Sequence, residues 1–271
     1  MILLGLALAT LAYGFAPGDT HTFRMEDRFE GYLPILGGNE GAVDIRMDLK
    51  VEGVAAKESE RRLTCEVADF ELIFNDVKMP LELEAVVDFF PKHAVDITGR
   101  GKTVKTEAKS SGLPIKLPGL EQDRLADITF IPLEWPEGPL AQDQTWKFER
   151  DFGGAPMRYE ATVKKLTDDQ AVIALVVSQS FSTLEDENRN AVKERSEAAS
   201  TVDTQMRGTG TATFDRKLGV FTLVEMSSTA TSTVRALSGK GDPVERKLAL
   251  THKVTRVPAS AGGKEALRGE N

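Results

Sequence analysis

The chain of 271 residues carries a formal net charge of −8; 41% of its residues are hydrophobic and 28% are charged. These values are typical of a folded globular protein and not of a disordered one. A nucleic-acid-binding surface needs clustered lysine and arginine, so the negative balance argues against a nucleic-acid partner. The same balance disfavours binding to anionic lipid by charge.

The beginning of the chain predicts a secretory signal peptide over residues 1–16. Ile2 to Leu11 is an apolar run, too short to span a bilayer, and small residues follow it, although no lysine or arginine precedes it. We expect cleavage after Gly14 or Ala16. The mature bacterial protein would then be exported, periplasmic or extracellular, with no transmembrane segment. The alternative is that the run is a buried N-terminal strand.

The clearest strand lies at residues 43–51. Its apolar side chains alternate strictly with charged ones, which places all the apolar groups on one face: Val43, Ile45, Met47, Leu49 and Val51. A strand buried on one face only is typical of an antiparallel sheet. Cys65, the only cysteine, lies on the apolar side of the next strand and is interpreted as a small buried hydrophobic residue.

The apolar phase changes along that next strand, from Leu63 and Val67 to Leu72 and Phe74. This change predicts a β-bulge near Ala68-Asp69. Leu81, Leu83 and Ala85 are expected to begin another strand. Five prolines mark residues 113–142 as a linker that cannot be a central strand throughout.

The second half of the chain shows the same alternation of apolar and polar residues. Strands are expected at 159–163, 171–184, 202–214, 220–226 and 248–254, with a hairpin turn at 167–170. Short helices are expected at Leu120–Ile128 and Asn190–Ser200. The predicted organisation is therefore a first β unit at 17–112, the proline-rich linker, a second β unit at 143–258 and a disordered tail at 259–271.

A weak internal repeat links the two units. Thr20–Phe23 matches Thr145–Phe148, and Phe89–Val95 matches Phe214–Val220, at the same offset of 125 residues. The predicted fold is mostly β, with two tandem related antiparallel units. Each unit would be a curved sheet or open half-barrel, and the chain would hold at most one or two short helices.

Motifs for catalysis or metal binding are missing from the sequence. His21, His93 and His252 lie far apart, and none has a second ligand at short spacing, so no metal site is expected. There is no nucleophile elbow and no glycine-rich phosphate loop before a helix. We therefore predict no catalytic residues, no cofactor and no enzymatic activity.

Two unusually apolar turns are the candidate binding features. They contain Tyr32, Leu33, Ile35 and Leu36 in the first unit, and Ile131, Leu133 and Trp135 in the linker. Turns are normally polar. Apolar turns therefore either close the core over the end of a sheet or form the rim of a ligand site.

The segment Leu133-Glu134-Trp135-Pro136-Glu137-Gly138-Pro139-Leu140, followed by Asp143-Gln144-Thr145-Trp146, resembles a linker junction in a family of uncharacterised exported bacterial proteins made of two β-rich repeats. In that junction a Gly-Asp-x-Trp motif follows a proline-rich linker; here Gln142 replaces the glycine, and the tryptophan lies one residue further on. The corner at Phe214–Gly219 also fits. This resemblance implies the fold but no activity. A looser analogy links the chain to the envelope lipoprotein carriers, whose curved half-barrels cradle acyl chains.

The leading hypothesis is a non-catalytic envelope protein that binds an apolar ligand, a lipid or acyl chain, in the curved sheet. The alternative is a structural or protein-interaction module without a small-molecule site, and a hydrolase is the third possibility. The sequence leaves the oligomeric state and the identity of the ligand open.

Overall fold

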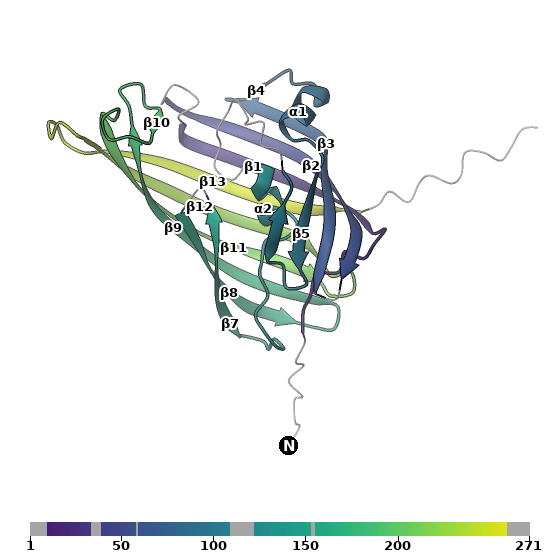
Figure 1. Cartoon of the computed structure of the whole chain (residues 1–271). Helices are drawn as coiled ribbons and strands as arrows, with labels where there is room; N and C mark the ends of the chain where they lie inside the picture. Colours follow the sequence, from purple (N-terminus) through teal and green to yellow (C-terminus); the bar gives the residue numbers. More distant parts are fainter. Residues whose placement is uncertain (1–9, 34–38, 58, 109–121, 153–154, 259–271) are drawn as a thin grey trace, which may run out of the picture.

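A computed structural model describes residues 10–33, 39–57, 59–108, 122–152 and 155–258. Its main feature is one curved, open antiparallel sheet of thirteen strands (Figure 1). The strands are β1 (Thr20–Leu33), β2 (Asn39–Lys57), β3 (Glu60–Phe74), β4 (Val77–Lys78), β5 (His93–Thr98), β6 (Thr103–Thr106), β7 (Thr145–Phe152), β8 (Ala155–Leu166), β9 (Gln170–Glu185), β10 (Ala191–Val192), β11 (Ser200–Asp215), β12 (Val220–Ala236) and β13 (Val244–Val257). The helices are α1 (Leu83–Phe89), the 3₁₀ turn η2 (Gln122–Arg124) and α2 (Leu125–Ile128).

The two halves of the chain form two adjacent parts of this one sheet. The order is β6-β5-β3-β2-β1-β13-β12-β11-β9-β8-β7, so each half is a contiguous antiparallel series. The halves join where β1 pairs with β13, from Thr22 opposite Val257 to Gly31 opposite Leu248. The mostly β, curved antiparallel fold predicted from the sequence is confirmed, and the two units share a single sheet.

The two anchors of the predicted repeat differ in the elements on which they lie. Thr20–Phe23 begins β1 and Thr145–Phe148 begins β7, which are the first strands of their halves. The second anchor is wrong, because Phe89 ends helix α1 whereas Phe214 lies in strand β11. The unit boundaries at 17–112 and 143–258, and the duplication itself, stay predictions.

The period-two pattern of β2 is confirmed. All five apolar residues between Val43 and Val51 are buried, and the intervening charges lie on the other face. There Arg24 of β1 forms a two-pronged ion pair with Asp48 at 2.8 Å. The predicted bulge is also confirmed, because Asp48 lies opposite Asp69 while Leu49 lies opposite Val67. Ala68 is the additional residue.

Two local predictions were wrong. The segment expected to begin a strand at Leu81 instead contains α1, in which Val86 is buried; Phe90, the C-cap one turn later, is buried as well. Residues 190–200 form the short strand β10 and turns, not a helix. Here the Asp186 carboxylate accepts hydrogen bonds from the backbone N–H groups of Asn188 and Asn190, which stabilise a turn instead. The expected helix at Leu120–Ile128 is present as η2 and α2 in its described part.

Two segments cover one face of the sheet at one end: residues 10–19 and residues 122–144. They contribute to an aromatic cluster formed by Tyr13, Phe15, Trp135, Phe214 and Phe221. The Tyr13 hydroxyl donates to the Leu133 carbonyl at 2.8 Å, and the rings of Trp135 and Phe221 stack at 5.6 Å. The end of the predicted signal peptide therefore packs inside the core, but residues 10–19 form no strand, and most of the apolar run lies outside the described residues.

Candidate functional site

A cavity of about 300 Å³ lies between α2 and the covered face of the sheet. Its wall comes from α2 and Pro132 of the linker, and from strands β1, β7 to β9 and β11 to β13. The lining is mostly apolar and includes Phe152, Met157, Phe181, Met206, Met226 and Leu250. Unbranched methionine side chains adapt to ligands of different shape, and this volume is at the lower end of the range of small-molecule sites.

Helix α2 is held across the sheet by polar contacts at two places. On one side, His252 of β13 contacts the Ile128 carbonyl at 2.8 Å through Nε2. On the other side, Arg150 of β7 donates to the carbonyls of Asp127 and Ile131 at 2.9 and 2.7 Å. Since β12, β11, β9 and β8 lie between β13 and β7 in the sheet, α2 bridges them and leaves the cavity beneath it.

The contact between His252 and Asp27 is a buried ion pair. Nδ1 of His252 lies 2.5 Å from Oδ1 of Asp27, and both residues line the cavity. Burial lowers the pKa of His252, but the charge of Asp27, its hydrogen bond and the Ile128 carbonyl together raise that pKa above its ordinary value of 6.5. With an acceptor at each ring nitrogen, the ring satisfies both contacts only as an imidazolium, which has two N–H donors.

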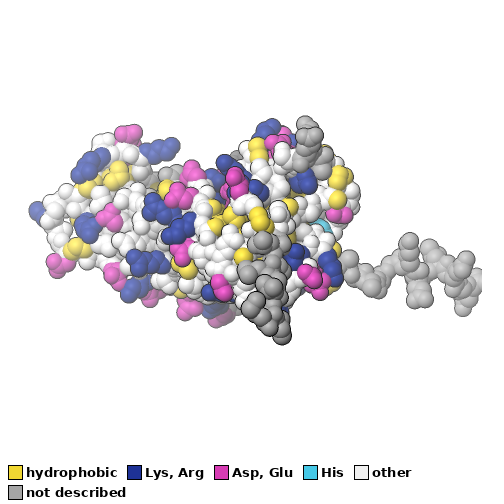
Figure 2. All heavy atoms as spheres, turned by 90° about the horizontal axis from the view of Figure 1, so that it is seen from below, with side chains coloured by type: hydrophobic (Ala, Val, Ile, Leu, Met, Phe, Trp, Pro, Cys, Tyr) yellow, Lys and Arg dark blue, Asp and Glu magenta, His cyan; other side chains and the backbone are white. Residues whose placement is uncertain are grey.

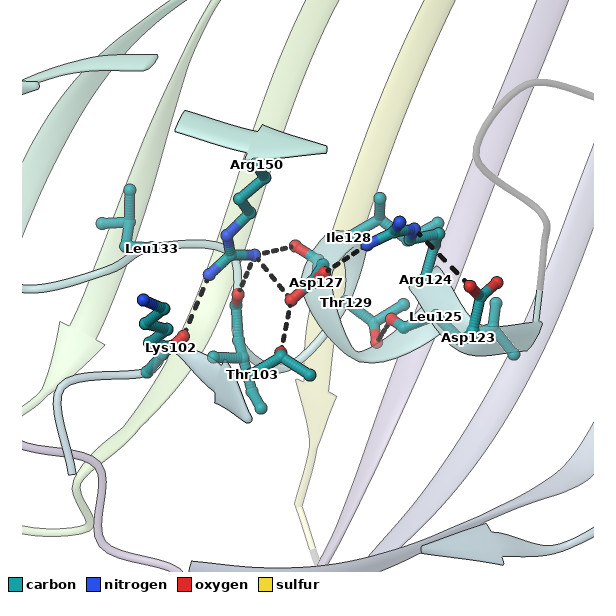
Figure 3. Close-up of polar contacts among 12 residues, drawn as sticks. Lys102, Thr103, Asp123, Arg124, Leu125, Asp127, Ile128, Thr129, Leu133 and Arg150 are labelled. Carbon is teal, nitrogen blue, oxygen red and sulfur yellow. Dashed lines mark hydrogen bonds and ion pairs between the residues drawn. The ribbon is translucent and has the colours of Figure 1, made fainter. Parts of the chain in front are cut away.

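Asp127 and Arg150 form the second buried pair (Figure 3). Their side chains are only 5% and 7% exposed, and Nη1 of Arg150 lies 3.1 Å from Oδ1 of Asp127. Thr103 donates to the same carboxylate oxygen at 2.7 Å, and Arg150 also reaches the Gly101 carbonyl at 3.1 Å. This network joins β6, α2 and β7. Buried charges are tolerated here because each is paired and hydrogen-bonded.

Tyr159 of β8 is the notable neutral polar residue of the cavity wall. It is 6% exposed, and its ring stacks on Phe148 at 4.6 Å. Burial raises the pKa of Tyr159 to about 12; nearby Arg150 lowers it in part. The phenol therefore keeps its proton at neutral pH.

The apolar turn residues predicted from the sequence lie elsewhere. Ile131, Leu133 and Trp135 are buried in the aromatic core, and none of them lines the cavity. Leu33 is also buried, and Tyr32 lies beneath the guanidinium of Arg246 at 4.3 Å. Ile35 and Leu36 lie outside the described residues. The three predicted residues of the linker turn thus close the core, whereas Pro132, between Ile131 and Leu133, lines the cavity.

The sequence pattern could have identified one cavity residue that the sequence analysis does not name. Asp27 occupies the buried phase of β1, between Met25 and Phe29. A carboxylate in an apolar phase signals a buried partner. His252 lies in the same phase as Leu250 and Val254 of its strand, but nothing in the sequence indicates that His252 and Asp27 meet.

The described residues contain no cluster of three or more His, Cys, Asp or Glu side chains suited to a metal ion. No helix within the described ranges has the length and apolar character needed to cross a membrane. On the face seen in Figure 2, basic and acidic side chains are interspersed. Cys65 is buried, and burial raises the pKa of its thiol to about 12.

The comparisons with known proteins show a shared fold. No family model matches the chain, and no curated protein matches it. The chain is similar to part of a structure described as "Lipid-protein interactions in lipovitellin", with a TM-score of 0.52 and 10% identity over 92% of this chain. It spans only 27% of that chain. DynF, from the dynemicin biosynthesis pathway of Micromonospora chersina, gives a TM-score of 0.20 and 7% identity, covering 94% of this chain and 87% of the DynF chain, and supports no structural argument.

Proposed function

We propose that this protein binds an apolar ligand, a lipid or acyl chain, in the cavity beneath α2. The observation that carries the proposal is a cavity of about 300 Å³ with mostly apolar walls on the covered face of a curved sheet. Apolar surface left facing a cavity is stabilised when a ligand removes it from water. The likeness to a lipovitellin structure that concerns lipid–protein interactions supports this class of ligand.

The proposed role is binding without catalysis. His252 is the group in the cavity best suited to proton transfer, yet both of its ring nitrogens are engaged, by Asp27 and by the Ile128 carbonyl. A general base needs a free nitrogen that faces its substrate. These contacts instead support a role in holding α2 over the cavity.

We also propose that the protein acts in the bacterial cell envelope after export. This part rests on the apolar run from Ile2 to Leu11. N-terminal sequencing of the protein recovered from its native compartment tests it. An intact Met1 on cytoplasmic protein would count against export without affecting the ligand proposal.

The ligand proposal is tested by binding and by blocking the cavity. The purified protein is extracted with organic solvent and the extract is analysed by mass spectrometry, and binding of a fluorescent fatty acid is then titrated. Met226→Trp fills the cavity and should abolish saturable binding, whereas Ser227→Trp, on the opposite face of β12, should preserve it. Absence of both co-purifying lipid and saturable binding would support the interaction-module alternative.

A further inference from the structure

The charges around the cavity bear on which apolar ligand it accepts. The described lining contains two carboxylates, Asp27 and Asp127, and the imidazole of His252, but no lysine and no arginine. Each carboxylate is already paired, Asp27 with His252 and Asp127 with Arg150. An anionic headgroup inside the cavity would therefore lose its hydration without meeting an unpaired cation in the described lining.

A hydrogen-bond donor is available in the same wall. Tyr159 is only 6% exposed and lines the cavity, and its phenol keeps its proton at neutral pH because burial raises its pKa to about 12. Buried polar groups in folded proteins nearly always have a partner, and a donor left without one costs free energy. A ligand oxygen in the cavity that accepts a hydrogen bond from this hydroxyl would satisfy a donor that lies in a mostly apolar wall.

We infer that the cavity selects an uncharged apolar molecule with a hydrogen-bond-accepting oxygen, such as an ester or ketone, over the corresponding carboxylate anion, with Tyr159 as the donor. This inference rests on the proposed function and narrows its ligand class. Tyr159 is thus a specificity-determining residue. Its ring is held in place by the stack on Phe148, so the hydroxyl is positioned before the ligand arrives.

The test compares methyl decanoate with decanoate, which differ only in the methyl group and the charge. Calorimetric titration at about pH 8 keeps decanoate ionised. We expect decanoate to bind at least roughly tenfold more weakly than its ester, because its charge is not neutralised in the cavity. Equal or tighter binding of decanoate would overturn the inference and leave the proposed function intact. Failure of both ligands to bind would instead count against the proposed function.

A matched pair of substitutions tests the donor. Tyr159→Phe removes only the hydroxyl and should weaken methyl decanoate binding by roughly fivefold, the value of one neutral hydrogen bond. Tyr32→Phe makes the same change in a tyrosine that lies under Arg246 and does not line the cavity, and it should leave the affinity unchanged. Melting curves verify that both variants fold. Unaltered ester binding by a folded Tyr159→Phe variant would show that this hydroxyl does not contact the ligand.

Discussion

Asp27 and His252 are separated by 225 positions in the chain and meet at 2.5 Å on neighbouring strands, where β1 pairs with β13. This pair lies at the junction between the two halves of the sheet. His252 also contacts the Ile128 carbonyl, so the junction, the cavity and α2 are linked through one imidazole.

The His252 pair predicts a pH dependence of stability. The folded-state pKa of His252 is raised above 6.5, so the stabilisation is fully present below about pH 6.5 and is lost as pH rises through the folded pKa. The free energy of unfolding should therefore fall above neutral pH. Burial is the main cause that lowers the pKa values of His21 and His93. These two residues therefore reduce the free energy of unfolding as pH falls, in the opposite direction to His252.

Urea unfolding of the wild type and of His252→Gln isolates the effect. The difference in unfolding free energy between the two should be larger at about pH 6 than at about pH 9. A difference that does not change with pH would mean that His252 is not charged in the folded protein.

The second buried pair should matter far more than a surface pair. Arg150→Met leaves Asp127 with only the longer contact to Arg124 at 3.8 Å as an ion pair and should destabilise the fold by about 3–5 kcal/mol. Arg158→Met, which removes the exposed pair with Glu149, should cost less than about 1 kcal/mol. Chemical denaturation measures both. Similar costs for the two variants would contradict the buried network.

The burial of the N-terminal segment predicts that removing residues before Pro17 lowers the stability of the protein. A chain that begins at Pro17 lacks Tyr13 and Phe15, which fill the aromatic cluster, and loses the hydrogen bond to the Leu133 carbonyl. Loss of a large buried aromatic costs about 3–5 kcal/mol, so this chain should be much less stable than one that begins at Thr10. Thermal unfolding compares them. Equal melting temperatures would remove these residues from the core and support cleavage after Ala16.

The alternation in β2 gives the fourth prediction. Ile45→Asp buries an unpaired charge and should cost several kcal/mol. Asp44→Asn changes a residue of the opposite face that pairs with Arg28, and it should leave the melting temperature nearly unchanged. Comparable losses in the two variants would mean that the assigned faces of β2 are wrong.

Local patterns determined the strands and several of their details. Period-two alternation identified β2, and the change of phase in β3 located the bulge at Ala68, since side chains of a strand must face either core or solvent. Turn chemistry placed the hairpin at 167–170, where the Thr167 N–H donates to the Gln170 carbonyl at 2.9 Å. Short apolar segments such as Leu81–Ala85 were ambiguous, because strand and helix patterns differ little over a few residues.

Only the tertiary structure decided that the two halves share one sheet and that a cavity lies beneath α2. Pairing of β1 with β13 joins residues from opposite ends of the chain, and no local pattern encodes that contact. No local sequence pattern encodes the contact of Asp27 with His252 or that of Asp127 with Arg150 either. In the sequence each of these residues is one polar or charged residue among others, and its role depends on which partner the fold brings within hydrogen-bonding distance.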